Sequence, residues 1–184
     1  MIEELIKQIQ EDRENRDKLG HIFTEREYAP KTLLLQEGEI ARTIYFIKEG
    51  CLREWFNKDG KSITFQFFFE GQPVASIDSF MNGTPSLFSI ESIEPTTAVL
   101  IRKEDFDRLF ILYPGLKDKF QRFIFSRFSN YAKLFLSRIT DTPQERYEDL
   151  VKTRPDIIQR IPQHYIASYL GITPVSLSRI RNRR

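Results

Sequence analysis

The chain has 184 residues, of which 40% are hydrophobic, and a net charge of +2. This composition suits one sizeable core plus a small second domain. No run approaches the roughly 20 apolar residues of a membrane span, and the charged N-terminus lacks the apolar region of a signal peptide. The single cysteine, Cys51, excludes an internal disulfide, a four-cysteine iron–sulfur cluster and a structural zinc site. We therefore expect a cytoplasmic protein without a cofactor.

Basic residues are concentrated at the C-terminal end of the chain. The last 25 residues contain no Asp or Glu and five arginines, namely Arg160, Arg179, Arg181, Arg183 and Arg184. Because the whole chain is only +2, the remainder is net acidic. A basic tail on an acidic body favours a polyanion as its partner. A solvated basic terminus without a partner is the alternative.

The first two thirds of the chain are predicted to form one short helix and then β-structure. Residues 2–18 are charged, with apolar side chains on one helical face. Beyond them, glycines recur every ten to twelve residues, and the segments between are rich in β-branched and aromatic residues. This spacing predicts a β-sandwich or jelly-roll-like β-roll. The expected strands include 33–35, 43–47, 51–56, 62–69, 88–92 and 98–101, with an Asp59-Gly60 hairpin turn.

A helical period replaces the strand pattern after Pro114. Apolar residues recur every three or four positions, namely Leu116, Phe120, Phe123, Ile124, Phe128, Tyr131, Phe135 and Ile139. A stripe this long usually packs on a partner helix, so we expect a dimer interface through Phe120, Ile124, Phe128, Tyr131 and Phe135. Packing of this helix on its own domain is the alternative. The following segment, TPQE at 142–145, predicts a capping box at the start of another helix.

The segment IASYLGITPVSLSRI, residues 166–180, has the spacing of a helix-turn-helix. Gly171 suits the left-handed turn, and Ala167 suits the close crossing of the two helices. Thr173 is expected to cap the second helix, and Pro174 to occupy its first position. The inward-facing residues are expected to be Ile166, Leu170, Ile172, Leu177 and Ile180.

The second helix of this motif is the candidate DNA reader. Ser176, Arg179 and Arg183 share one outward stripe, and Arg179 is the candidate for a bidentate contact to guanine. Thr173, Val175 and Ser178 are expected to contact bases or phosphates near the helix start. The arginines off the stripe, Arg181 and Arg184, are expected to neutralise phosphates. A helical hairpin without nucleic acid is the alternative for the whole motif.

Taken together, these motifs resemble the Crp/Fnr family of transcriptional regulators from about Lys31 to Arg184. KTLLLQEGEIARTIYFIKEGCLREWFNKDGKSI, residues 31–63, looks like the opening of that family's cyclic nucleotide-binding-like domain. The resemblance implies a bacterial homodimer that binds a palindromic operator in double-stranded DNA, with Arg179 at an operator-reading position. It further implies RNA polymerase and a small-molecule effector as partners.

The chain departs from this family in two places. Ligand-binding members carry a Gly-Glu pair for the ribose and, about ten residues later, an Arg-Ser pair for the cyclic phosphate. Here Ala75 and Ser76 stand at the first pair and Ser86 and Leu87 at the second, with no arginine between Arg53 and Arg102. An unpaired buried phosphate is costly, so we do not expect a response to cyclic AMP. The effector pocket, if retained, is expected at Ala75, Ser76, Ile77, Asp78, Ser86 and Leu87.

The second departure concerns the C-terminus, where the sequence stops after the second helix of the motif and predicts no β-hairpin wing. The expected fold class is therefore α+β. It comprises a β-roll sensor domain (1–112), a dimerisation helix (113–140) and a wingless helix-turn-helix domain (141–184). The expected function is a DNA-binding regulator. A sensor or scaffold that acts through protein–protein contacts is the alternative, and an enzyme is not expected because no nucleophile–base pair, metal spacing or phosphate-cradling loop occurs.

Overall fold

The computed structural model describes residues 11–12, 19 and 21–182. Almost all of the helix expected over residues 2–18 lies outside the described residues. The chain divides into two compact units, Met1–Asp107 and Arg108–Arg184. Within the described residues, no helix is long and apolar enough to cross a membrane.

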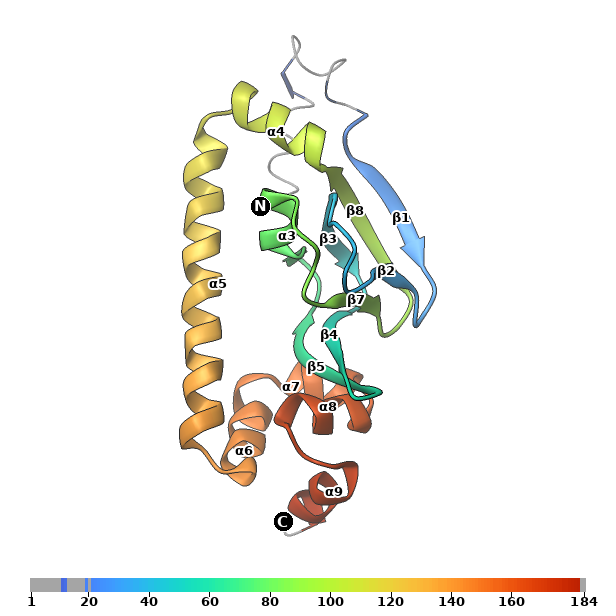
Figure 1. Ribbon diagram of the computed structural model, residues 1–184, viewed down its shortest axis with the longest axis vertical. Helices are drawn as coiled ribbons and strands as arrows, with labels where there is room; N and C mark the ends of the chain where they lie inside the picture. The colour runs from blue at the N-terminus through green and yellow to red at the C-terminus, as the bar shows by residue number, and fades with distance from the viewer. Residues whose placement is uncertain (1–10, 13–18, 20, 183–184) are drawn as a thin grey trace. The chain divides into compact units, whose positions relative to one another are not determined.

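The first unit contains two four-stranded antiparallel sheets (Figure 1). One sheet has the order β1 (Thr24–Tyr28), β8 (Thr96–Arg102), β3 (Thr43–Glu49) and β6 (Pro73–Val74). The other has the order β2 (Leu33–Leu35), β7 (Ser89–Ser92), β4 (Leu52–Lys58) and β5 (Lys61–Phe68). The predicted β-roll is thus confirmed. The short helix α3 (Ile77–Asn82) follows β6, and α4 (Lys103–Leu112) follows β8 across the boundary between the units.

The β4–β5 hairpin forms where its turn residues predict it. Lys58 pairs with Lys61, which leaves Asp59 and Gly60 as a two-residue turn. Both residues have positive φ, 52° and 78°, as a turn that matches the right-handed strand twist requires. The turn sets the register as far as the Trp55–Thr64 pair, and a one-residue irregularity between Glu54 and Trp55 then brings Leu52 opposite Phe68. Both of these side chains are buried.

The second unit is helical. Its first complete helix is α5 (Gly115–Thr140), and four shorter helices follow: α6 (Pro143–Thr153), α7 (Pro155–Arg160), α8 (Gln163–Leu170) and α9 (Pro174–Asn182). The short helices share a small core made of Tyr147, Leu150, Ile157, Ile161, Ile166, Ala167, Leu170 and Leu177. This core fixes α8 and α9 against α6 and α7, and so positions the candidate reading helix.

The predicted capping box starts α6. The Thr142 side chain accepts a hydrogen bond from the Glu145 amide at 3.3 Å, and the Glu145 carboxylate accepts one from the Thr142 amide at 2.8 Å. Pro143 stands at the first helical position, where its missing N–H costs nothing. Two backbone donors that the helix itself cannot satisfy are thereby bonded.

Candidate nucleic-acid interface and effector pocket

Helices α8 and α9 form the helix-turn-helix that the sequence predicts. Gly171 adopts the left-handed conformation, with φ 71° and ψ 31°, and ends α8. Its amide and that of Ile172 bond back to the Ser168 and Ala167 carbonyls, each at 3.0 Å. Ala167 is completely buried, as expected for the residue at the closest approach of the two helices.

The start of α9 is capped by Thr173. Its hydroxyl oxygen accepts a hydrogen bond from the Ser176 amide at 3.1 Å, and Pro174 occupies the first helical position. Leu177 is buried and anchors the inner face of α9, whereas Ile172 and Ile180 are only half-buried. The helix is therefore held by its first turn and by one central apolar contact.

Most of the residues expected to contact DNA are exposed to solvent on this helix. Ser176 is half-buried. The exposed residues are Thr173, Val175, Ser178, Arg179 and Arg181. Arg183 and Arg184 lie outside the described residues. Because the sequence has no Asp or Glu after Asp156, no acidic side chain from this segment opposes the positive charge.

The six residues expected at the effector pocket do not share one environment. Ala75, Ser76 and Ser86 are buried, and the Ser86 hydroxyl donates to the Phe88 carbonyl at 2.6 Å. Ile77 is half-buried at the start of α3. Asp78 is exposed in the first turn of α3 and accepts hydrogen bonds from the side chains of Asn82 and Thr84, whereas Leu87 is 77% exposed. Their role in ligand binding therefore stays a prediction.

A cavity of about 360 Å³ lies elsewhere in the first unit, beside α3. Its walls come from the segment 40–42, from α3 and from the first residues of α4, and none of the six expected residues lines it. Within the described ranges, no group of three His, Cys, Asp or Glu residues is arranged to hold a metal ion.

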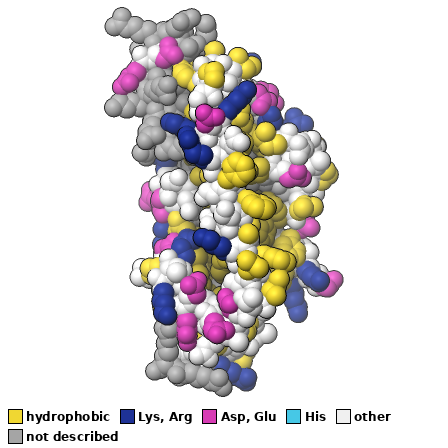
Figure 2. Space-filling view, turned by 90° about the vertical axis from the view of Figure 1, so that its left-hand side faces the viewer, with side chains coloured by type: hydrophobic (Ala, Val, Ile, Leu, Met, Phe, Trp, Pro, Cys, Tyr) yellow, Lys and Arg dark blue, Asp and Glu magenta, His cyan; other side chains and the backbone are white. Residues whose placement is uncertain are grey.

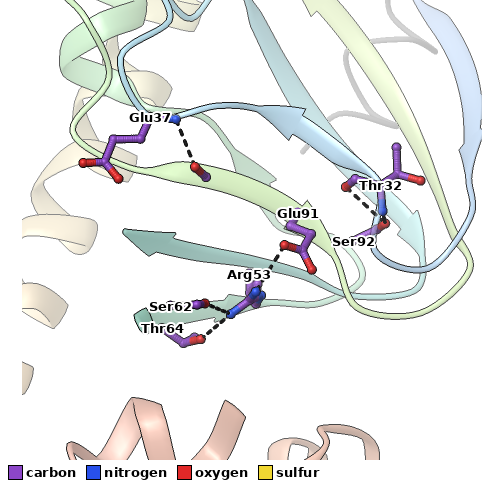
Figure 3. A network of polar contacts seen from close by, with 8 residues as sticks. Thr32, Glu37, Arg53, Ser62, Thr64, Glu91 and Ser92 are labelled. Atoms are coloured by element: carbon purple, nitrogen blue, oxygen red, sulfur yellow. Dashed lines mark hydrogen bonds and ion pairs between the residues drawn. The ribbon is translucent and has the colours of Figure 1, made fainter. Parts of the chain in front are cut away.

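Arg53 is the centre of a buried polar network in the sheet that contains β4 (Figure 3). Its guanidinium donates to the hydroxyls of Ser62 and Thr64, both at 2.8 Å, and to the Glu91 carboxylate at 3.1 Å. The same group lies 5.0 Å from the centre of the Trp55 ring. The Arg53 guanidinium therefore binds side chains of its own sheet.

The apolar stripe on α5 is exposed. No residue of this helix is buried, and Figure 2 shows hydrophobic side chains gathered in a band along it. Of the five residues expected at the dimer interface, Phe120 and Ile124 are half-buried and Phe128, Tyr131 and Phe135 are exposed. Other apolar side chains that are more than half exposed extend the band, namely Phe125, Leu136 and Ile139.

Two arginines outside the helix-turn-helix contact its first helix, which the sequence patterns do not predict. Arg138, in the last turn of α5, donates to the Tyr169 carbonyl. Arg146, in α6, donates to the Leu170 carbonyl at 3.0 Å. Contacts over 31 and 24 residues follow no local period, so no pattern in the sequence could have revealed them.

The family model of the cyclic nucleotide-binding domain matches residues 25–113, a range that spans both sheets of the first unit. The first unit is therefore similar to a cyclic nucleotide-binding domain. A comparison with curated protein sequences finds no match.

Solved structures resemble the chain over nearly its whole length. FixK2 from Bradyrhizobium japonicum is 18% identical, with a TM-score of 0.76 over 88% of this chain and 84% of that one. A CooA mutant from Carboxydothermus hydrogenoformans is 17% identical, with a TM-score of 0.72 over 97% and 83%. The regulator CLP from Xanthomonas campestris is 16% identical, with a TM-score of 0.68 over 91% and 88%. The chain thus has the fold of the Crp/Fnr regulators.

Proposed function

We propose that this protein is a transcription regulator that binds double-stranded DNA as a homodimer and reads a palindromic operator with α9. The observation that carries the proposal is the α8–α9 motif, whose second helix is capped, anchored by Leu177 and exposed along its basic side. Such a helix fits the major groove and presents its N-terminal residues to base edges. The proposal implies a cytoplasmic protein.

Arg179 and Arg181 have different roles in this proposal. Arg179 is exposed in the last turn of α9 and can make a bidentate contact to guanine. Arg181, two residues later, points about 200° away around the helix and is assigned to a phosphate. Arg183 and Arg184 extend the same basic end. Together they provide both base readout and the sequence-independent part of the affinity.

The relatives support a regulatory role. A second CooA structure with this fold is described as a CO-dependent transcription factor, and CLP as a c-di-GMP-responsive global regulator. These ligands differ, so the fold specifies no effector. For this chain we infer a sensor domain that does not respond to cyclic AMP, together with contacts to RNA polymerase on the promoter.

The test begins with selection of a preferred duplex from a random library by the purified protein. Filter binding is then measured over a salt series on the selected duplex and on a random one. Arg179→Ala should cost about 1–3 kcal/mol on the selected duplex and relax preference at one base pair per half-site. Arg181→Ala should weaken both duplexes evenly and make the salt dependence shallower by about one counterion.

Two outcomes contradict the proposal in different ways. If both variants lose the same affinity on both duplexes, Arg179 contacts a phosphate, and other residues read the bases. No measurable binding by the wild-type protein would remove DNA as the partner and favour a scaffold that acts through protein contacts.

A further inference from the structure

The C-terminal end of α8 is closed by a complete set of donors. A helix leaves its last four carbonyls without partners inside the helix, here those of Ala167, Ser168, Tyr169 and Leu170. The turn amides of Ile172 and Gly171 bond to the first two. The guanidiniums of Arg138 and Arg146 bond to the other two.

These two arginines are well suited to that position. The C-terminal end of a helix carries the negative pole of the macrodipole, and a cation there forms charge-assisted hydrogen bonds. They come from different helices, since Arg138 lies in α5 and Arg146 in α6. The end of α8 is thus tied to both helices at once.

Arg146 also joins these elements at a second point. Its other terminal nitrogen donates at 2.5 Å to the carbonyl of Asp141, the residue that caps α5. The Asp141 carboxylate in turn accepts from the hydroxyls of Ser137 and Thr140, at 2.6 and 2.7 Å. One guanidinium therefore bridges the end of α5 and the end of α8, two helices separated by α6 and α7 along the chain.

Fixing α8 also fixes α9. The two helices pack against each other, Ala167 of α8 is completely buried, and Leu177 of α9 is buried in the shared core. The α8–α9 pair therefore moves as one body, and its attachment to α5 sets the direction in which α9 points relative to the long helix.

We propose that Arg138 and Arg146 are positioning residues that hold α9 at one orientation to α5 and thereby select the half-site spacing that the dimer accepts. This inference rests on the proposed function. Two reading helices related by a dimer axis along α5 meet two half-sites only if each leaves α5 at the correct angle. We call the attachment of α8 to α5 and α6 through Arg138 and Arg146 the joint. An operator with a changed spacer is then bound more weakly, because the rigid joint cannot change the direction of α9.

The experiment compares Arg138→Gln, Arg146→Gln and the double variant with the wild-type protein. Glutamine shortens the reach and removes the charge while it keeps a polar side chain. Arg122→Gln is the matched control, because Arg122 is an exposed arginine on the same long helix, outside this joint. Affinity is measured for a single half-site and for paired half-sites whose spacer is lengthened or shortened by one or two base pairs.

We expect the wild-type protein and the control to prefer one spacer strongly. In the double variant the ratio of affinities between the best and the altered spacers should fall by about tenfold, while single half-site affinity stays within about twofold. Each single variant should show a smaller change. A loss of affinity at every spacer and at the single half-site alike would show that the arginines bind phosphate or support folding, and would overturn the spacing role.

A measurement without DNA examines the joint directly. Spin labels at Lys133→Cys on α5 and Val175→Cys on α9 report the distance between the helices, in labelled protein diluted with excess unlabelled protein. Both sites are exposed, whereas Cys51 is completely buried. The distance distribution should broaden in the double variant and not in the control. An unchanged distribution would overturn the positioning role.

The outcomes separate the two proposals. If the wild-type protein binds no duplex, the proposed function fails and the spacing role fails with it. If it binds an operator and the double variant keeps the same spacer preference, only the spacing role is overturned.

Discussion

Arg53 and Glu91 form a cross-strand ion pair whose energetics depend on burial. They lie directly opposite on β4 and β7, and the arginine side chain is only 4% exposed. Removal of one partner from a buried pair typically costs about 3–5 kcal/mol, because the other charge is left uncompensated. The chain therefore cannot release this guanidinium to a ligand phosphate without loss of stability.

The serines at positions 76 and 86 decide what the first unit can do with a cyclic nucleotide. Titration calorimetry of the full chain with cyclic AMP and cyclic GMP should show no specific binding, because Ser76 and Ser86 stand where the resemblance requires a glutamate and an arginine. Both serines are buried, and neither can compensate the charge of a desolvated phosphate. Micromolar affinity for either nucleotide would contradict the prediction. A parallel titration of Arg53→Met would then reveal whether Arg53 leaves Glu91 to bind it.

The turn that leads from α5 into α6 contains two carboxylates that accept hydrogen bonds. The backbone amide of Thr142, followed by its hydroxyl, lowers the pKa of Glu145 below its usual value. The hydroxyls of Ser137 and Thr140 lower the pKa of Asp141 in the same way. Both groups favour the ionised form in the folded protein, so their contribution to stability is present above the ordinary carboxylate pKa and is lost as the pH falls through the lowered one.

The α6 capping box should therefore be sensitive to acid. Thr142→Ala should lower the stability of the helical unit by about 1 kcal/mol near neutral pH. Glu145→Gln should have a lower melting temperature than the wild type near neutral pH. The difference in melting temperature should shrink as the pH falls below about 4.5. Thermal unfolding followed by circular dichroism gives both results.

Glu148→Gln is the control for the capping box, because Glu148 is also on α6 but bonds to the Gln144 side chain instead of to backbone amides. A melting difference between the wild type and Glu145→Gln that persists unchanged at acidic pH would rule out the carboxylate as its source.

At the scale of the whole molecule, the exposed apolar band along α5 is the surface expected to bind a partner. Helix α5 spans 26 residues, none of them buried, and Phe128 and Phe135 are more than 60% exposed. An exposed apolar band of this kind is typical of a protein–protein interaction site. A second copy of the chain, packed along the same face, is the partner that the proposed function provides.

Phe128→Glu should abolish this assembly. A charge at the centre of the band would be buried without a partner, at a cost of several kcal/mol. The variant should run as a monomer in light scattering at concentrations where the wild type is a dimer. Asn130→Glu adds the same charge about 200° away around the helix and should leave the dimer intact. A well-folded dimer of Phe128→Glu would place the interface elsewhere.

Local chemistry made several features predictable. The Asp59-Gly60 turn, the left-handed Gly171 and the Thr142 capping box are each specified by residues within four positions of one another, and all three are found. The short helices α3 and α7 were not predictable in the same way, since six residues are too few to show a helical period.

The sequence by itself determined the two kinds of architecture, the positions of the turns and the helix-turn-helix, because strand and helix periods and capping residues act over short distances. Only the tertiary structure decided which distant side chains meet. Arg53 is committed to Glu91 across 38 residues, and Arg138 to the end of α8 across 31. Such pairs arise when folding buries a charge or leaves a helix end without donors, and the need for a partner appears only once the elements have packed.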